Sequence, residues 1–282
     1  VSMIVGVFAF WIRALRWRLI IEPLGYKVTN SDCWHGVTIG YITNFAIPRA
    51  GEIARCSVIT KRAKIPIEKV GGTVVLERSV DLVSLMLISF LVIILNWKRF
   101  GSFFIDNIYS GIESKFEIFI LIYVFIAFII IAISSLFIYK YKKENIIVKK
   151  ISGLINGITQ GVTAGFSMNN KGLFFLYTAL LWVCYWLMSY TTILAFPAIT
   201  NMSVVDAMFL MIVGGFGWVI PVQGGIGAYH LIISLALSSV YNIEQTTGVI
   251  FATISHESQA ITMIIFGAIS LLITYLFKSK KS

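Results

Sequence analysis

The chain has 282 residues, of which 58% are hydrophobic and only 13% charged. A soluble domain carries roughly a quarter charged residues, so this composition excludes an ordinary water-soluble enzyme or binding module. The net charge is +10, but the basic residues lie in short clusters between apolar stretches, as they do on cytoplasmic loops of membrane proteins. We therefore expect a membrane protein whose partners are lipids, and no nucleic-acid partner.

Several apolar stretches are long enough to cross a bilayer, which takes about 20 residues in a helix. The prediction is an all-α, polytopic membrane helix bundle, with residues 1–282 forming a single integral membrane domain. In chain order, the stretches expected to span run from Val1 to about Ile21, Val70 to Asn96, Phe116 to Tyr139, Lys171 to Ile199 and Gly248 to Phe277.

The segments between these stretches are more polar. Trp97 to Lys115 predicts a polar loop. Between Lys140 and Asn170, apolar residues recur at helical spacing with lysines between them, which indicates an amphipathic helix in the headgroup plane or, alternatively, a plain linker. Ser203, followed three residues later by Asp206, predicts a capping box that starts a helix running to Ile220.

Two apolar segments are interrupted by the same pattern, Ile-Pro-x-x-Gly, at Ile47 to Gly51 and at Ile220 to Gly224. Such breaks free backbone groups that hydrocarbon cannot satisfy, so they persist where they face protein or a water-filled cavity. We expect two re-entrant or broken helical hairpins related as an inverted repeat, with repeats over about 1–96 and 171–277 and a connecting helix and amphipathic linker over 97–170. The alternative is two loops between ordinary full spans.

The distribution of Lys and Arg orients the chain. If the cluster that begins at Lys140 and the C-terminal Lys278 to Lys281 are cytoplasmic, most other basic residues also fall inside. The first hairpin then enters from the cytoplasm and the second from outside. The arginines between Arg13 and Arg18, flanked by Trp11 and Trp17, are typical of a membrane interface.

Arg49, Glu52 and Arg55 surround the first break. Glu52 and Arg55 are three residues apart and therefore share a helix face. Because the planar fork of arginine suits phosphate recognition, this cluster is a candidate site for an anionic lipid headgroup. The alternative is a cytoplasmic-side cap of snorkelling arginines.

Gln223, Gly224, Gly225 and Gly227 form the second break and open a helix. Exposed amides at the positive end of a helix dipole attract phosphate or carboxylate, which makes this turn the second part of the predicted binding site. Glycine used only for close helix packing is the alternative.

Five ionisable residues lie inside apolar stretches, where charge usually faces a cavity or a partner. Arg78 and Asp81 can pair at i, i+3, which leaves Glu77 for a partner on another helix. His256 and Glu257 sit at comparable depth in the last stretch. We expect these residues to gate the site or balance its charge; a purely structural ion-pair network and a packing histidine are the alternatives.

The segments Arg13 to Arg18, Asn44 to Glu52, Glu77 to Asp81 and Pro221 to Gly227 resemble, in this order, the lysylphosphatidylglycerol synthase transmembrane-domain family. The resemblance covers nearly the whole chain. The family includes the flippase half of the bacterial multiple peptide resistance factor. It implies a protein of a bacterial or archaeal cytoplasmic (inner) membrane, with a cytoplasmic C-terminus, that moves or handles lipid. It also implies one more helix before Val1.

Two departures from the family pattern lie at the second break. Gln223 stands where the family has a second proline, and His230 where it has an acid, so no coupling or headgroup role is carried over to His230. No segment resembles the synthase domain, so aminoacyl transfer is not expected.

The leading functional hypothesis is a flippase-like transporter that handles a phospholipid or polyprenyl-phosphate-type headgroup. The alternative is a membrane enzyme, or an accessory subunit of one, acting on lipid-linked substrates; a scaffold without transport and a homo-oligomer remain open. The sequence shows no nucleophile with an adjacent base, no metal-ligand spacing and no CxxC pair among its three cysteines. We therefore expect no catalytic residues, no metal and no cofactor.

Overall fold

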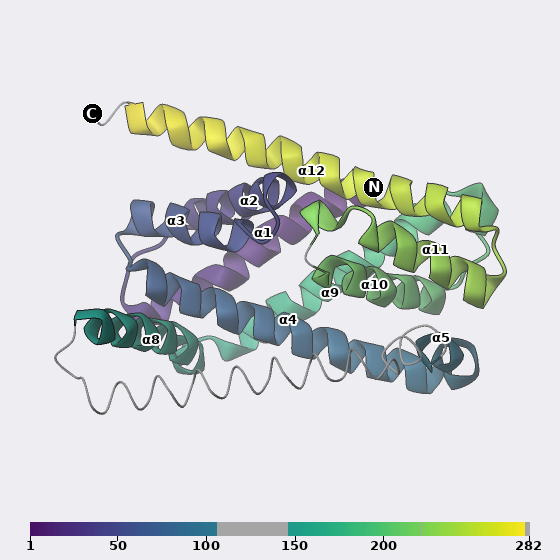
Figure 1. The fold of residues 1–282 in the computed structure, drawn as a ribbon, viewed down its shortest axis with the longest axis horizontal. Helices are drawn as coiled ribbons and strands as arrows, with labels where there is room; N and C mark the ends of the chain where they lie inside the picture. The colour runs from purple at the N-terminus through teal and green to yellow at the C-terminus, as the bar shows by residue number, and fades with distance from the viewer. Residues whose placement is uncertain (106–145, 221, 280–282) are drawn as a thin grey trace.

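The computed structural model describes residues 1–105, 146–220 and 222–279. The regular secondary structure of these residues consists of helices, which turns and short loops connect (Figure 1). Within these residues, four helical segments are long and apolar enough to cross a membrane: Ile67–Leu95, Lys171–Leu194, Gln223–Tyr241 and Gln245–Thr274. The prediction of an all-α, multi-pass membrane protein is confirmed. The predicted span from Phe116 to Tyr139, Pro221 and the last two lysines lie outside the described residues.

The helices fall into two series with a similar order of lengths. Each series has a long helix, then two short helices separated by a turn, and then a longer helix. The first series is α1 (Ser2–Ile21), α2 (Asn30–Ala46), α3 (Gly51–Ala63) and α4 (Ile67–Leu95), and the second is α9 (Lys171–Leu194), α10 (Val204–Val219), α11 (Ala228–Tyr241) and α12 (Gln245–Ser279).

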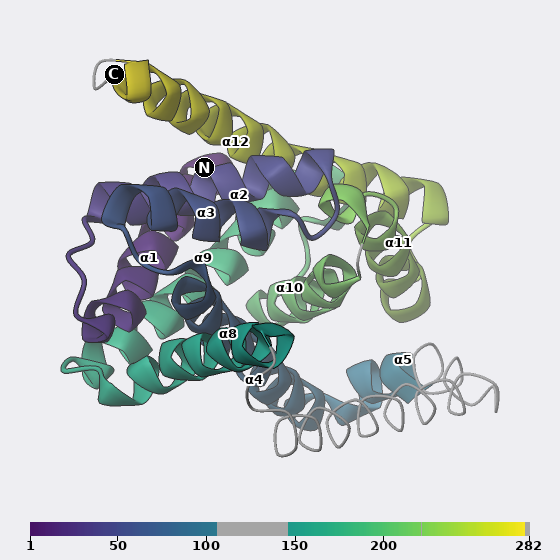
Figure 2. The same cartoon turned by 60° about the vertical axis from the view of Figure 1, so that its left-hand side comes forward.

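Helices α4 and α12 run on opposite sides of α2, α3, α10 and α11, and α8 packs on α4 (Figures 1 and 2). Helix α1 packs along α9, so the first helices of the two series are in direct contact. Helix α12 packs against α11 of its own series and against α2 of the other, and α4 contacts both α3 and α10. Each long helix therefore joins the two series.

Local sequence signals explain where α2 and α10 begin. The Ser203 hydroxyl accepts from the Asp206 amide at 3.3 Å and the Asp206 carboxylate accepts from the Ser203 amide at 2.8 Å, which confirms the predicted capping box. Thr29 and Asp32 make the same reciprocal pair at the start of α2. Thr29 and Asp32 are three residues apart in the sequence, as Ser203 and Asp206 are.

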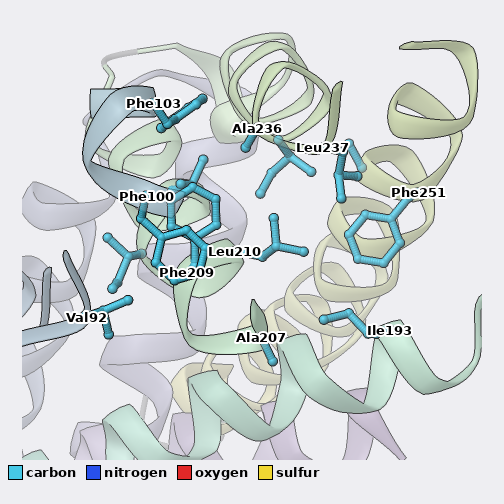
Figure 3. Packing of buried hydrophobic residues seen from close by; sticks show 14 of the residues in the cluster. Val92, Phe100, Phe103, Ile193, Ala207, Phe209, Leu210, Ala236, Leu237 and Phe251 are labelled. Atoms are coloured by element: carbon cyan, nitrogen blue, oxygen red, sulfur yellow. The ribbon is translucent and has the colours of Figure 1, made fainter. Parts of the chain in front are cut away.

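The predicted polar loop after Asn96 is wrong in its first part. Trp97–Gly101 forms a π-helical turn and α5 (Ser102–Phe104) follows it. Phe100 is fully buried and stacks on Phe209 of α10 with ring centroids 4.2 Å apart, and Phe103 meets the same ring edge-on (Figure 3). Burial of the two aromatic rings stabilises this segment more than exposure of its polar residues favours a loop, because aromatic side chains bury large apolar areas.

Helix α8 (Ile146–Ala164) confirms the helix predicted between Lys140 and Asn170. Its buried residues are small, and a Cβ atom on Gly161 would lie 2.1 Å from the carbonyl oxygen of Lys69 in α4. This is the small-residue packing common between membrane helices. Leu154 and Ile155 remain exposed, so placement of the helix in the headgroup plane stays a prediction.

Candidate functional site

A cluster of charged side chains is buried where α1, α3 and α4 meet. At its centre lies Glu77 of α4, whose side chain has no exposed surface. Its carboxylate accepts from Arg55 of α3 at 2.6 Å and from Arg13 of α1 at 2.8 Å, and Arg16 lies 3.5 Å away. The partner expected for Glu77 on another helix is thus supplied by two helices at once.

Asp81 lies one helical turn beyond Glu77 and binds the same two arginines of α1. Its carboxylate is 2.6 Å from Arg16 and 3.1 Å from Arg13. The predicted pair between Arg78 and Asp81 is the longest of these contacts, at 3.9 Å, and Arg78 is closer to Glu52, at 3.3 Å. The predicted pair is therefore present, but it is a weak part of a larger network, because α1 brings two arginines closer to Asp81.

Arg13 and Arg16 face into the protein, and their depth in the membrane stays a prediction. The side chain of Arg13 is 6% exposed and that of Arg16 is fully buried. Arg18, on another face of α1, does lie near the surface and pairs with Glu22 at 2.7 Å. The sequence carried a signal for this difference: Arg13 and Arg16 are three residues apart and the two acids on α4 are four apart, so each pair shares one helix face.

Neutral groups complete the shell around the arginines. The guanidinium of Arg55 lies over the ring of Trp17, 3.8 Å from its centroid, and the Trp17 indole donates to Thr73 at 3.0 Å. From α9, the hydroxyl of Tyr185 accepts from Arg13 at 2.9 Å. Trp17 is fully buried and therefore belongs to the packed shell of the cluster. The α9 contact extends the cluster into the second series.

The charges of this cluster do not balance. Four arginines (Arg13, Arg16, Arg55 and Arg78) face three carboxylates (Glu52, Glu77 and Asp81), which leaves one positive charge in excess among the described residues. The Nε atoms of all four arginines are buried and have no hydrogen-bond acceptor within that part of the chain. Each arginine has a carboxylate partner, but Arg13, Arg16 and Arg55 share only Glu77 and Asp81, so the site favours a further anionic or acceptor group.

A small crevice opens onto the cluster beside the first break. Its walls include Tyr41, Asn44, Gly51, Glu52 and Arg78. The volume that the centre of a water molecule can occupy in it is about 10 Å³. This is close to the space that one water needs. The crevice is therefore nearly closed.

Gly51, which starts α3, is required by space. Its amide donates to the Asn44 side chain at 2.7 Å, and a Cβ atom on it would lie 2.2 Å from the carbonyl oxygen of Gly40. Helices α2 and α3 therefore approach too closely at this point for any other residue. The glycine of the first Ile-Pro-x-x-Gly pattern therefore allows α2 and α3 to pack closely against each other.

The two breaks, far apart in the sequence, are in contact. Arg49, in the turn between α2 and α3, adopts a positive φ of 61° and donates to the carbonyl oxygen of Val219 at the end of α10. In the opposite direction, the Gln223 amide donates to the carbonyl oxygen of Ala46 at 3.5 Å. Arg49 therefore does not join Arg55 in the buried cluster but bridges the two breaks.

The second break is a glycine turn whose backbone only glycine adopts readily. Gly224, Gly225 and Gly227 all have positive φ, of 55°, 81° and 84°. The amide of Gly225 donates to Val222 at 3.4 Å, and that of Gly227 to Nδ1 of His230 at 3.4 Å. Two of the amides predicted to bind phosphate therefore already have partners in the chain.

His256 of α12 supports this turn. Its Nε2 lies 2.8 Å from the carbonyl oxygen of Gly224, its Nδ1 lies 3.0 Å from Glu257, and its ring stacks on Trp218 with centroids 5.1 Å apart. His256 is fully buried, whereas the Glu257 side chain is 48% exposed. His230 lies with its ring centroid 5.0 Å from that of His256. The structure thus brings His256 and Glu257 to the predicted turn, but not to the arginine cluster.

The fold and this site define a multi-pass helical membrane protein with a buried, cationic polar centre. A model of the lysylphosphatidylglycerol synthase TM region matches residues 1–267. The chain therefore belongs to the lysylphosphatidylglycerol synthase TM region family, a membrane domain linked to lipid modification and flipping. Neither a curated protein nor a solved structure matches it.

Proposed function

We propose that this protein is a lipid flippase-like transporter, which passes the headgroup of a phospholipid or polyprenyl-phosphate-type lipid through a polar centre while the acyl tails stay in the bilayer. The observation that carries the proposal is the excess positive charge of the buried cluster. A lipid phosphate supplies the missing anion, and arginine binds phosphate oxygens through two parallel hydrogen bonds. Family membership supports the lipid as the source of that phosphate.

Arg78 is the arginine best placed to meet the headgroup. Its side chain is 42% exposed, lies at the crevice and is held by Glu52 across 3.3 Å, whereas Arg13, Arg16 and Arg55 are buried against carboxylates. A phosphate entering the crevice competes with Glu52 for Arg78. In this scheme Glu52 occupies the phosphate's place when the site is empty.

The contacts between the two breaks suggest how the crevice opens. Arg49 to Val219 and Gln223 to Ala46 are hydrogen bonds between side chain and backbone, across the two breaks. Hydrogen bonds of this kind are individually modest, at about 1 kcal/mol net. We propose that these contacts part to admit a headgroup and that Arg49 and Gln223 then line the opened path, while the buried pairs around Glu77 stay intact.

Two broken hairpins that meet near the centre are the arrangement of transporters built from inverted repeats. The matched order of helix lengths in the two series and the contact between their breaks support this interpretation. We propose that the hairpins enter from opposite faces, with the C-terminus in the cytoplasm of a bacterial or archaeal cell. Alternating movement of one series against the other then exposes the centre to each side in turn.

The experiment is a headgroup-accessibility assay in sealed proteoliposomes that contain headgroup-labelled phosphatidylglycerol. The wild-type protein is expected to move label between leaflets, with at least a tenfold slower rate for Arg78→Gln. Arg18→Gln is the matched control, because Arg18 makes a surface pair on α1 away from the crevice. Equal rates for wild type, Arg78→Gln and protein-free vesicles would refute transport of this lipid.

The same vesicles separate the runner-up function. A membrane enzyme or accessory subunit that acts on lipid-linked substrates would change the mass of the lipid without moving it. Extraction and mass spectrometry of the lipid after the assay therefore decide between the two classes.

A further inference from the structure

A second polar cluster lies beside the glycine turn and takes no part in the proposed lipid site. His230 of α11 and His256 and Glu257 of α12 each place one side-chain ligand atom within 4.8 Å of the others. They are two of the three histidines in the chain and one carboxylate. His256 is fully buried, and both its neighbours are more exposed.

Hydrogen-bond chemistry fixes the protonation of His256. The carbonyl oxygen of Gly224 can only accept, so Nε2 of His256, at 2.8 Å, must carry a proton. In the neutral ring the other nitrogen, Nδ1, is then an acceptor. It faces Oε1 of Glu257, also an acceptor when ionised, across 3.0 Å. Two acceptors at this separation repel unless a cation lies between them.

The cation is either a proton or a metal ion, and the third group distinguishes the two. A shared proton needs only His256 and Glu257. His230, however, brings another ring nitrogen to the same place. Binding an ion releases the Gly227 amide from Nδ1 of His230, because a neutral ring has only one unprotonated nitrogen. The set of two histidines and one carboxylate is a familiar zinc donor set that leaves one position open.

We infer that His230, His256 and Glu257 bind a divalent transition-metal ion of the zinc class. Ligand atoms about 2.1 Å from such an ion stand roughly 3.4 Å from one another in a tetrahedral site. The distance of 3.0 Å between Nδ1 and Oε1 is already close to this separation. The ligand atom of His230 lies within 4.8 Å of both, so it must approach by up to about 1.4 Å. His230 and Glu257 have the partial exposure that permits it.

The surroundings of His256 match those of a metal ligand. A ligating histidine usually donates its other ring N–H to a carboxylate or backbone carbonyl, which orients the ring and keeps the ligating nitrogen free of its proton. The bond to Gly224 does this, and the stacked Trp218 ring restrains the imidazole plane. The remaining titratable group beside the trio, Tyr229 of α11, is paired with Ser255 at 2.9 Å.

An ion in this place would tie α11 to α12 and, through the Gly224 carbonyl, fix the glycine turn. Sequence spacing gave no indication of it, since His230 and His256 are brought together only by the packing of α11 on α12. The inference is independent of lipid transport. Either proposal can fail while the other stands.

The test is titration of the detergent-solubilised full chain with Co²⁺, followed by displacement with Zn²⁺. The protein is purified without an oligohistidine tag, because such a tag would bind both ions. The expected result is one equivalent of metal with the visible absorption of tetrahedral cobalt. Glu257→Gln, His230→Gln and His256→Gln should each weaken binding by at least tenfold, and His35→Gln, which alters the remaining histidine, should leave it unchanged.

Glu257→Gln is the decisive variant because its half-exposed side chain can change without disturbing the core. Gel filtration and circular dichroism confirm that each variant is folded. Three results overturn the inference: no stoichiometric binding by the wild type, binding that survives Glu257→Gln and His230→Gln, or a cobalt–thiolate band, which would place the metal on one of the buried cysteines.

Discussion

The two breaks have the same sequence pattern but are held by different chemistry. The α2–α3 hairpin is anchored by charge, since Arg55 pairs with the fully buried Glu77. The α10–α11 break is anchored by a glycine turn, one hydrogen bond from His256 and stacked aromatic rings. The difference shows that a shared helix order fixes where a polar centre lies, but not which interactions stabilise it.

The comparison also predicts unequal sensitivity. Loss of one member of a buried ion cluster strongly lowers the stability of the fold, because its partner charges stay buried with fewer opposite charges. A turn held by backbone conformation and one side-chain donor loses only that interaction. Substitutions in the first series should therefore destabilise the protein more than equivalent ones in the second, in the order that follows.

The largest effect is expected for Glu77→Gln. The substitution leaves the buried Arg55 without a carboxylate partner and leaves Arg13 and Arg16 with Asp81 alone, so the free energy of unfolding should fall by about 3–5 kcal/mol. Unfolding by SDS in mixed micelles measures it. Glu22→Gln removes an exposed pair with Arg18 and should change stability by less than about 1 kcal/mol. A Glu77→Gln protein as stable as this control would show that the cluster is not an ionic anchor.

Gly51→Ala tests the anchoring of the first break by close packing. The added methyl group would meet the Gly40 carbonyl at 2.2 Å, and this backbone atom cannot move without separating α2 from α3. We expect a loss of about 3 kcal/mol, at the upper end for overpacking. Gly71→Ala on α4, where nothing lies within 4 Å, should be neutral or slightly stabilising. Similar stabilities for the two variants would mean that the hairpin tolerates separation.

His256→Phe tests the second break. Phenylalanine keeps a ring against Trp218 but loses the donor to the Gly224 carbonyl. An unsatisfied buried acceptor should reduce the free energy of unfolding by about 2 kcal/mol, and amide exchange at Gly224 to Gly227 should quicken. If destabilisation exceeds that of Glu77→Gln, the proposed ranking of the two breaks is wrong.

The smallest effect is expected for Gly227→Ala. The position has open space around it but a φ of 84°, so the substitution adds backbone strain of about 1–2 kcal/mol without a clash. The same SDS titration measures it, with Gly172→Ala, a helical glycine that also has open space, as the control. No difference between the two would show that the turn can relax to an ordinary conformation.

The sequence predicted the elements that depend on local pattern. Apolar length marked α4, α9 and α12, and the Ser203 to Asp206 spacing marked the start of α10. The proline-glycine pattern marked both breaks, since each signal lies within a few neighbouring residues.

What the sequence did not predict depends on which helices meet. The burial of Arg13 and Arg16 depends on acids from α4, more than 60 residues away, so no local pattern alone indicates it. His230 was set aside for departing from the family pattern, whereas its position is defined by α12. Phe100 and Phe103 were assigned to a loop because only the α10 rings make their burial favourable (Figure 3).

Lipid transport by this protein requires that the excess positive charge of the arginine cluster binds an anionic headgroup. The most direct measurement is native mass spectrometry of the delipidated protein titrated with phosphatidylglycerol and, separately, with phosphatidylcholine. We predict a preference for the anionic lipid that is lost in Arg78→Gln and kept in Arg18→Gln. A preference that survives Arg78→Gln, or none in the wild type, would contradict the central claim.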